Sequence, residues 1–200
     1  KYARLLIHPR KLINTLLSDH ASKERAKREE KILSINTNYF GRTRWDMALT
    51  KMYNPKRSYF YCSEALRPAF KLADKKWLLK TQSEFTIVSI GGGHVLKGYD
   101  LTLRTAELLS RLSNRSFKWL LCGPSLSEMH LFEKLTNISC NDVNVVPLGK
   151  CSADDVVEKL VGSTIYVHTS YIDNSPNSIC EAQYIGMPVI STNVGGISSL

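Results

Sequence analysis

The sequence lacks several features that would place it in a specialised class of protein. No stretch approaches the roughly 20 consecutive apolar residues of a membrane-spanning helix. Residues 1–17 contain four Lys and Arg and no sustained apolar run of the kind that a secretory signal has. Five cysteines are an odd number, they are widely scattered, and none belongs to a C-x-x-C pair. The sequence therefore favours neither a disulfide framework nor a zinc site. We expect a globular protein of a reducing, cytoplasmic compartment.

Positive charge is concentrated in the first part of the chain. Residues 1–80 contain 19 Lys and Arg and 7 Asp and Glu, a net charge of +12, whereas residues 81–200 contain 8 and 11, a net charge of −3. A basic segment of this kind is compatible with nucleic acid, an anionic membrane surface or a phosphorylated acceptor, and equally with a solvated basic helix. Charge alone does not decide between these interpretations.

Strand and helix patterns alternate after residue 80. The predicted strands are 85–90, 117–122, 143–147, 164–168 and 188–191, and the predicted helices are 99–112, 126–135, one that begins after Ser152, and 178–185. Such alternation predicts an α/β domain with a doubly wound, Rossmann-like parallel sheet. Residues 1–80 are predicted to be mainly helical, with a long helix at 9–33 and a short strand paired with a helix at 37–67. We place the domain boundary in the polar stretch 71–84, which divides the chain into 1–80 and 81–200.

The run from Ser170 to Ala182 indicates a ligand-binding loop. It follows the apolar strand 164–168, contains turn-forming residues, and leads into an amphipathic helix whose first N–H groups are free to bind an anion. Asp173 and Glu181 lie on either side of the start of that helix. Carboxylates close to an anion site are suited to binding the hydroxyls of a sugar or ribose, so the loop is predicted to bind a nucleotide sugar.

Seven residues separate Asp173 from Glu181. With this spacing the chain resembles the retaining glycosyltransferases of family 4, which have the GT-B fold and whose hallmark is a Glu, seven residues and a second Glu. Asp173 replaces the first Glu, and the run Asn174-Ser175-Pro176-Asn177 replaces a common Gly-Phe-Gly. The resemblance is strong over 85–200 and weak before it. It implies a donor-binding domain, incomplete at its C-terminal end, preceded by the end of an acceptor domain, and we do not expect full transferase activity from this chain alone.

A glycine-rich loop follows the first strand of this domain, in the run 91–98. It does not match a dinucleotide-binding fingerprint, because Leu96 occupies the position of the third glycine, nor a P-loop, because Tyr99 occupies the position of the lysine. In the family this loop supplies an Arg and a Lys that neutralise the donor diphosphate. Lys97 matches the Lys, whereas Gly92 stands where the Arg is usual, so Arg42 or Arg44 is a candidate for the second charge.

The resemblance implies a role for each residue of the motif. Lys97 and Asp173 are the predicted catalytic residues, and Glu181 is expected to bind the ribose. The predicted donor-binding residues are Gly91, Gly92, Gly93, Lys97, Leu148, Gly149, Asn177, Ser178 and Glu181. We expect no metal and no cofactor, because a lysine and a helix terminus can stabilise the leaving diphosphate; the donor substrate is a nucleoside-diphosphate sugar.

The expected partners are a nucleotide sugar and a sugar or lipid-linked acceptor, in polysaccharide or glycolipid biosynthesis. The basic first segment suggests peripheral contact with the anionic inner face of a membrane. Two alternatives stay open: another GT-B sugar-nucleotide enzyme, such as an epimerase, and a non-catalytic nucleic-acid-binding module that uses the basic residues and aromatics of the first segment. The net negative charge of residues 81–200 argues against the second, and no nucleic-acid partner is expected.

Overall fold

The computed structural model describes residues 9–63, 65–79 and 85–200, with side chains from residue 19 onward. The chain divides into two compact units. The first comprises Lys1–Gly41 and Asp46–Cys62, and the second comprises Arg42–Trp45 and Ser63–Leu200. The main division therefore falls between Cys62 and Ser63, earlier than the boundary at residue 80 that the sequence suggests. That the first unit belongs to an acceptor domain stays a prediction.

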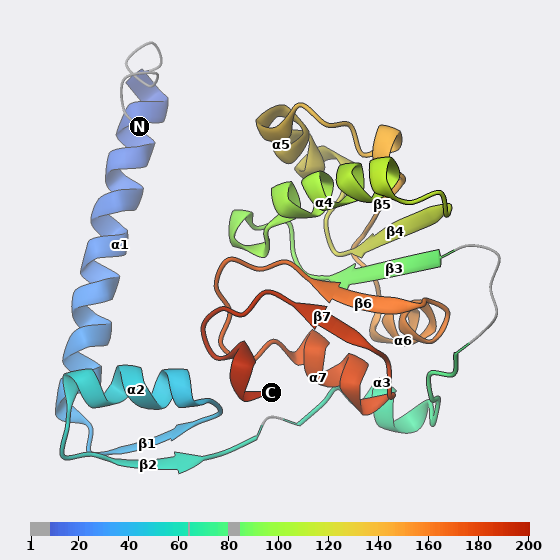
Figure 1. Ribbon diagram of the computed structural model, residues 1–200. Helices are drawn as coiled ribbons and strands as arrows, with labels where there is room; N and C mark the ends of the chain where they lie inside the picture. Colours follow the sequence, from blue (N-terminus) through green and yellow to red (C-terminus); the bar gives the residue numbers. More distant parts are fainter. Residues whose placement is uncertain (1–8, 64, 80–84) are drawn as a thin grey trace. The chain divides into compact units, whose positions relative to one another are not determined.

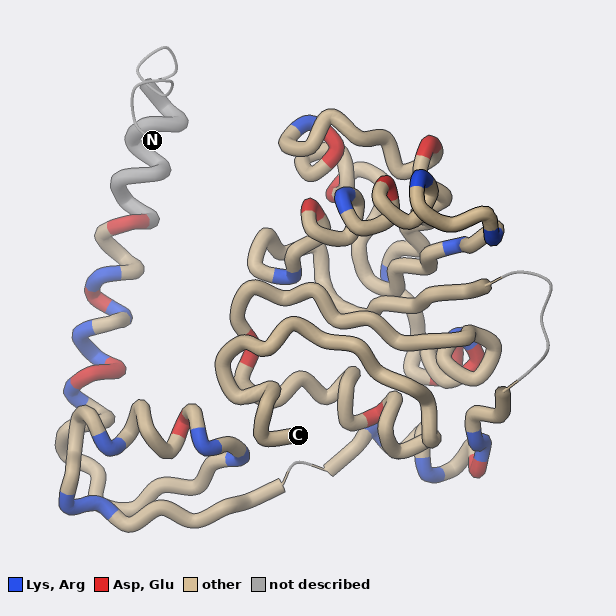
Figure 2. The backbone as a smooth tube through the Cα atoms, viewed as in Figure 1, with Lys and Arg blue, Asp and Glu red and all other residues tan. Residues whose placement is uncertain are grey.

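The first unit consists of a long helix and a small βαβ arrangement (Figure 1). Its elements are α1 (Pro9–Ile35), β1 (Asn38–Gly41), α2 (Arg44–Tyr53) and β2 (Ser58–Tyr61). The two strands are parallel, with Asn38 opposite Ser58 and Gly41 opposite Tyr61. The long helix, the short strand and the helix that the sequence predicts are all present. The charged character of α1 is plain in Figure 2, where basic and acidic residues alternate along its described part.

The second unit is built on a five-stranded parallel sheet in the order β5-β4-β3-β6-β7. Its strands are β3 (Phe85–Ile90), β4 (Phe117–Cys122), β5 (Val145–Gly149), β6 (Ile165–His168) and β7 (Val189–Ser191). The chain winds outward from β3 to β5 and then returns to place β6 on the other side of β3. This is the doubly wound order that the sequence predicts, with its switch point between β3 and β6.

Helices cover both faces of this sheet. The helices are α3 (Pro68–Leu72), α4 (Tyr99–Leu112), α5 (Leu126–Thr136), α6 (Ala153–Val161) and α7 (Asn177–Tyr184), with short 3-10 turns at η2 (Val95–Lys97), η3 (Asn141–Val143) and η4 (Ile197–Ser199). Buried residues of α4 and α5 pack in one core cluster, and those of α3, α6 and α7 pack in another on the opposite face (Figure 1). The α/β, Rossmann-like fold class is thereby confirmed.

The largest shift of a strand start is at β5, whereas β6 and β7 each begin one residue later than predicted. The predicted strand 143–147 includes Val143, but Val143 ends η3 and β5 starts at Val145. Asn144 lies between them in the left-handed region, with a φ of 55°, and its N–H closes the turn on the carbonyl of Asn141. Asn tolerates this conformation better than other non-glycine residues. The turn therefore overrides the apolar pattern at Val143.

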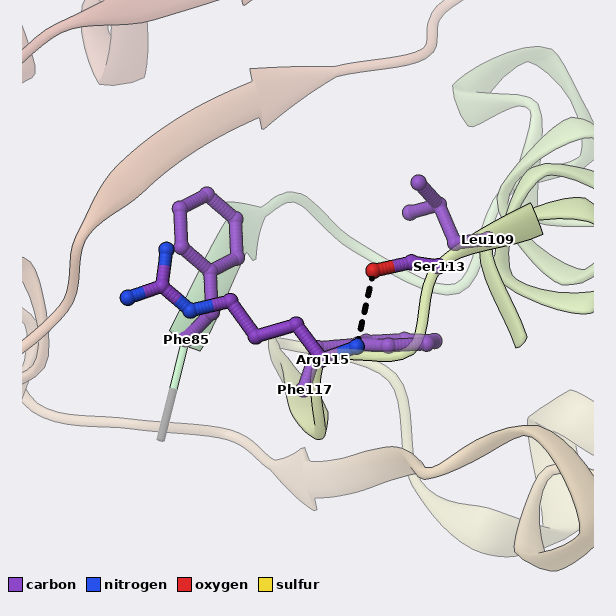
Figure 3. A pocket seen from close by; sticks show the side chains of 5 residues that line it. All are labelled: Phe85, Leu109, Ser113, Arg115 and Phe117. Carbon is purple, nitrogen blue, oxygen red and sulfur yellow. Dashed lines mark hydrogen bonds between the residues drawn. The ribbon is translucent and has the colours of Figure 1, made fainter. Parts of the chain in front are cut away.

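The amino ends of β3 and β4 border a small apolar pocket (Figure 3). Its volume is about 180 Å³, and it is lined by Phe85, Leu109, Ser113, Arg115 and Phe117. Phe85 and Phe117 are the first residues of their strands. Because ligands of open parallel sheets bind at the carboxyl ends of the strands, this pocket lies at the edge opposite the predicted site.

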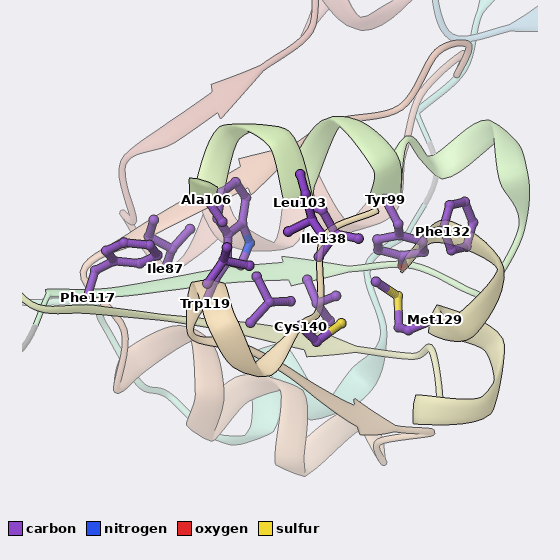
Figure 4. Close-up of a cluster of buried hydrophobic side chains, with 13 residues drawn as sticks. Ile87, Tyr99, Leu103, Ala106, Phe117, Trp119, Met129, Phe132, Ile138 and Cys140 are labelled. Atoms are coloured by element: carbon purple, nitrogen blue, oxygen red, sulfur yellow. The ribbon is translucent and has the colours of Figure 1, made fainter. Parts of the chain in front are cut away.

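The core on the α4 and α5 face combines aliphatic side chains with the aromatic rings of Tyr99, Phe117, Trp119 and Phe132 (Figure 4). Trp119 of β4 is fully buried, and its Nε1 donates to Ser89 Oγ at 2.9 Å. Ser89 Oγ in turn donates to the carbonyl of Val167. A buried indole N–H thus has a partner, as it must in an apolar interior. The chain Trp119–Ser89–Val167 also ties β4, β3 and β6 together.

Residues 65–79, which include part of the stretch 71–84 where the sequence places the domain boundary, pack within the second unit. Phe70 of α3 is buried, and α3 lies against α6. Trp77 donates from its backbone to the carbonyl of Ile185 and from Nε1 to the carbonyl of Ser163, both at 2.8 Å. These contacts hold the segment that carries Arg67 against the sheet domain.

Candidate functional site

The loops that follow the parallel strands are joined to one another at the carboxyl edge of the sheet. The N–H of Gly91, after β3, donates to Cys122 at the end of β4, and the N–H of Gly123 donates to Gly149 at the end of β5. The N–H of Tyr171, after β6, donates to Leu96 in the first loop at 2.8 Å. The loop after β3, the ends of β4 and β5 and the loop after β6 are therefore connected at this edge. Polar groups at this edge are where a doubly wound sheet binds its ligand.

Two glycines allow these loops to approach closely. Gly98 has a φ of 69°, and a Cβ there would lie 2.0 Å from the carbonyl oxygen of Thr169. Gly123 has a φ of 129°, and a Cβ would lie 1.8 Å from the carbonyl oxygen of Gly91. Both positions demand glycine. A Cβ at Gly92, in contrast, would meet no atom within 4 Å, so the backbone is open to a ligand at this point.

The structure brings together the two predicted catalytic residues. Lys97, at the end of η2, and Asp173, after β6, form an ion pair with Nζ 2.7 Å from Oδ2. His168 Nε2 lies 3.3 Å from the same oxygen. Burial raises the pKa of Asp173, but the adjacent His168 and Lys97 outweigh it and lower this pKa to about 2. Asp173 is therefore a carboxylate at neutral pH.

A buried polar chain connects Asp173 to the start of α7. His168 is 3% exposed, and its Nδ1 lies 3.1 Å from Oη of Tyr166, which is fully buried. Tyr166 Oη lies 2.8 Å from Oγ of Ser178 in the first turn of α7. Sequence reasoning missed His168 and Tyr166. The signal was available, because two polar-tipped residues two apart in a buried strand point to the same face of the sheet.

The start of α7 is exposed to a pocket that contains Arg42. Pro176 is the N-cap residue and forms no side-chain capping bond, so the first N–H groups of the helix remain available for a ligand. Arg42 donates from Nη1 to Oδ1 of Asn177 at 3.3 Å. The pocket has a volume of about 180 Å³ and is lined by Arg42, Ser63, Leu66, Ser175, Asn177, Cys180, Ser199 and Leu200. Of the two arginines that the sequence proposes as a second cation, Arg42 lies beside the helix start, whereas the contact of Arg44 is a backbone N–H donated to Ser199 Oγ.

Glu181 is held by an arginine that sequence reasoning missed. Arg67 Nε lies 2.6 Å from Oε1 of Glu181, and Arg67 Nη2 lies 2.8 Å from Oε2. Glu181 is 1% exposed, so this bidentate pair neutralises a buried carboxylate. The hydrogen bonds to Glu181 raise the pKa of Arg67 further above its ordinary value. No local motif links the two residues, because 114 positions separate them.

Arg67 also lines a second pocket at the carboxyl edge. This pocket has a volume of about 210 Å³ and is lined by Arg67, Ile90, Gly91, Gly92, Cys122, Gly123, Lys150, Cys151 and Val156. Of the predicted donor-binding residues, Gly91 and Gly92 lie here. A Cβ at Gly93 would instead meet the carboxyl group of Glu128. Leu148 packs against the core cluster on the α6 side, and Gly149 accepts the N–H of Gly123.

The described residues include no group of three or more His, Cys, Asp or Glu side chains able to hold a metal ion. Metal independence stays a prediction. None of the helices in the described part of the chain combines the length and apolar character that crossing a bilayer requires. The cysteines are free thiols, and burial, with the neighbouring Cys151, raises the pKa of Cys122 to about 12.

The fold and the loops at its carboxyl edge define a Rossmann-like domain with a polar ligand site at the switch point of the sheet. The family model described as "Glycosyl transferases group 1" matches residues 71–200. The chain therefore belongs to the group 1 glycosyl transferases. A search of curated proteins found no match.

Solved structures with the GT-B fold resemble the chain. A TarM mutant of S. aureus, in complex with Fondaparinux, alpha-GlcNAc-glycerol and UDP, has a TM-score of 0.64 and 18% identity over 84% of this chain and 33% of its own. Sucrose-phosphate synthase from Thermosynechococcus elongatus has a TM-score of 0.63 and 16% identity over 88% of this chain and 45% of its own. WaaG, a glycosyltransferase involved in lipopolysaccharide biosynthesis, has a TM-score of 0.58 and 18% identity over 78% of this chain and 44% of its own. The chain thus spans between a third and a half of the length of these structures, and such identities establish the fold alone.

Proposed function

We propose that the protein is the donor-binding part of a glycosyltransferase that transfers a sugar from a nucleoside-diphosphate donor with retention of anomeric configuration. The observation that carries this proposal is the ion pair between Lys97 and Asp173. The two residues lie in the loops after β3 and β6, and Lys97 Nζ is 2.7 Å from Asp173 Oδ2. The loop after β6 also leads into α7. A cation in this position can bind the phosphates of a donor, and the adjacent carboxylate can bind the hydroxyls of its sugar.

In this proposal each group binds a different part of the donor. Lys97 and the first N–H groups of α7, at Asn177 and Ser178, take the diphosphate, because cations and helix N-termini stabilise phosphate charge. Arg42, beside Asn177, adds a second positive charge. Asp173 accepts a hydrogen bond from a hydroxyl of the transferred sugar, and Glu181 accepts from the ribose. Gly91, Gly92, Gly93, Leu148 and Gly149 provide backbone contacts.

The proposed reaction needs no protein nucleophile. The acceptor oxygen forms a bond to the anomeric carbon as the bond from that carbon to the diphosphate oxygen breaks, on the same face of the sugar. The departing diphosphate takes the proton of the acceptor hydroxyl. Lys97 and the start of α7 stabilise the negative charge that develops on the diphosphate, which is where fixed cations and dipoles accelerate a reaction most.

The acceptor in this proposal is a sugar or a lipid-linked sugar, in polysaccharide or glycolipid biosynthesis. WaaG, which shares the fold, acts in lipopolysaccharide biosynthesis, and this supports such an acceptor. The net charge of +12 over residues 1–80 supports peripheral binding to the inner face of a membrane from the cytoplasm. Sedimentation with liposomes tests the membrane contact: equal binding to neutral and anionic vesicles would count against it.

The donor site is tested by thermal stabilisation with a panel of nucleoside diphosphates and their sugars, UDP among them. We expect one nucleotide to raise the melting temperature of the parent chain, since a ligand at 100 times its Kd stabilises by about 2.7 kcal/mol. Lys97→Ala and Glu181→Ala should lose the shift, whereas Lys134→Ala, an exposed lysine of α5, should retain it. Addition of EDTA should leave the shift unchanged. No stabilisation of the parent by any nucleotide would overturn the proposal.

Retention is tested separately from donor binding. In a chain that hydrolyses or transfers the donor, proton NMR identifies the anomer of the sugar released first. The same anomer as in the donor supports retention, and the opposite anomer contradicts it. A product with an inverted centre elsewhere on the ring would instead identify an epimerase, the alternative within the same fold.

A further inference from the structure

Arg67 is a charged side chain at the site to which the proposed function gives no role. Arg67 is the residue immediately before α3, and it lies outside the loops that follow the parallel strands. Its guanidinium holds Glu181 through Nε at 2.6 Å and Nη2 at 2.8 Å. The side chain of Arg67 is 39% exposed, whereas that of Glu181 is 1% exposed. The guanidinium of Arg67 therefore covers the carboxylate of Glu181, and the arginine is the member of the pair that is accessible to a ligand.

The local sequence fixes the position of Arg67. Pro68 follows it, and a residue before proline is restricted to extended conformations, as the φ of −55° and ψ of 137° at Arg67 confirm. The guanidinium carbon lies 5.3 Å from the centre of the Phe70 ring, and Phe70 is 1% exposed. A buried ring on one side and a buried carboxylate on the other hold the planar group in one orientation.

The pocket next to Arg67 is suited to an anion. Arg67 and Lys150 are its charged lining residues, and none of the described residues that line it is acidic. Gly91 and Gly92 form another side, and the space above Gly92 is open. Glu181 does not line this pocket. A ligand that enters it therefore meets positive charge and bare backbone, a combination that favours phosphate oxygens.

We propose that Arg67 is a donor-binding residue whose guanidinium contacts a phosphate of the nucleotide, with Glu181 as the buried counterion that orients it. The inference rests on the proposed donor site and extends it to a residue outside the motif. Nη1, which makes no bond to Glu181, is the group that faces the phosphate. Lys150, on the other side of the pocket, supplies a second positive charge.

The test compares ligands that differ in phosphate content. Isothermal titration gives the Kd of the parent chain for the nucleoside diphosphate that stabilises it, and the Kd for the corresponding uncharged nucleoside. We expect Arg67→Met to weaken binding of the diphosphate about tenfold or more, as loss of a charge-assisted bond does, and to change nucleoside binding far less. Arg67→Lys should recover part of the loss. Equal weakening for both ligands would overturn the proposal. A residue that acts only through Glu181 would weaken the binding of the ribose, which the diphosphate and the nucleoside both contain.

A second variant separates binding from folding. Arg67→Met leaves Glu181 buried and unpaired, which destabilises a fold, whereas the double variant Arg67→Met with Glu181→Gln removes both charges. We expect the double variant to bind the diphosphate about tenfold more weakly than Glu181→Gln alone. Identical Kd values for those two chains would again overturn the proposal. Arg115→Met is the matched control, because Arg115 also lies over a phenylalanine, at 5.9 Å from the Phe85 ring, but at the opposite edge of the sheet.

Binding by the parent chain distinguishes failure of the proposed donor site from failure of the proposed role of Arg67. If no nucleoside diphosphate binds the parent, the proposed function itself fails. If the parent binds the diphosphate and Arg67→Met binds it equally well, the donor site stands and only the role of Arg67 fails.

Discussion

Nζ of Lys97 lies 2.7 Å from Oδ2 of Asp173, although 76 positions separate the two residues in the chain. The lysine follows β3 and the aspartate follows β6, and these strands are neighbours at the switch point of the sheet. Each side chain is largely buried, with exposures of 30% and 18%. The pair therefore places one positive and one negative group at the same point of the carboxyl edge, and a diphosphate that binds Lys97 competes with Asp173 for it.

Acid should weaken the fold through Asp173. Its folded-state pKa is lowered from 3.8 to about 2, so its contribution to stability is complete above the unfolded-state value and is lost as the pH falls from about 4 to about 2. A shift of this size corresponds to roughly 2 kcal/mol. Urea unfolding at pH 5 and pH 2.5 should show a larger loss for the parent than for Asp173→Asn. Equal losses would mean that Lys97 and His168 do not hold the carboxylate.

Replacement of His168 should destabilise the protein and loosen Asp173. His168→Leu removes a hydrogen-bond partner of Tyr166 Oη and the imidazole that lies 3.3 Å from Asp173 Oδ2. An unmade buried hydrogen bond costs about 1–3 kcal/mol. In the same variant, the loss of unfolding free energy between pH 5 and pH 2.5 should be smaller than in the parent and closer to that of Asp173→Asn. Urea unfolding measures both effects. Exposed His20→Leu, in α1, serves as the control and should leave the pH dependence of unfolding unchanged.

Most of the second unit follows from local sequence patterns. β3, α4 and β4 begin and end at the predicted residues, because apolar periodicity and their turns agree. The meeting of Lys97 with Asp173 could also be anticipated, since the carboxyl ends of parallel strands share one edge. Where local turn chemistry competes with apolar pattern, as at Val143 and Asn144, the pattern gave the wrong strand start.

The missed residues depend on contacts between distant segments. Arg67 reaches Glu181 only because residues 65–79 pack against the sheet domain through Phe70 and Trp77. The stretch 71–84, in contrast, is polar and charged enough to be taken for a linker. The contact of His168 with Asp173 was hidden for a different reason, since a histidine that ends a buried strand gives no indication of its partner in the following loop until that loop is placed.

Loss of Lys97 should affect phosphate recognition selectively. Lys97→Met removes the cation beside Asp173 and should weaken binding of the stabilising nucleoside diphosphate about tenfold, with little effect on the uncharged nucleoside. Lys97→Arg should retain most of the affinity. The affinity of the parent should also fall with added salt more than that of Lys97→Met, because salt screens the attraction between Lys97 and the phosphates. If the diphosphate and the nucleoside lose affinity equally, Lys97 has no special role toward phosphate.

Two glycines of the same loop should respond in opposite ways to alanine. At Gly98 a Cβ would lie 2.0 Å from the carbonyl of Thr169 and the φ of 69° is unfavourable, so Gly98→Ala should cost at least about 2 kcal/mol of unfolding free energy. At Gly92 a Cβ meets nothing within 4 Å, so Gly92→Ala should change stability by less than about 0.5 kcal/mol. Because Gly92 lines the pocket beside Arg67, the same substitution should still weaken nucleotide binding. Chemical unfolding and titration of the two variants check both statements, and a Gly92→Ala chain with unchanged stability and unchanged Kd would show that the donor does not approach the backbone there.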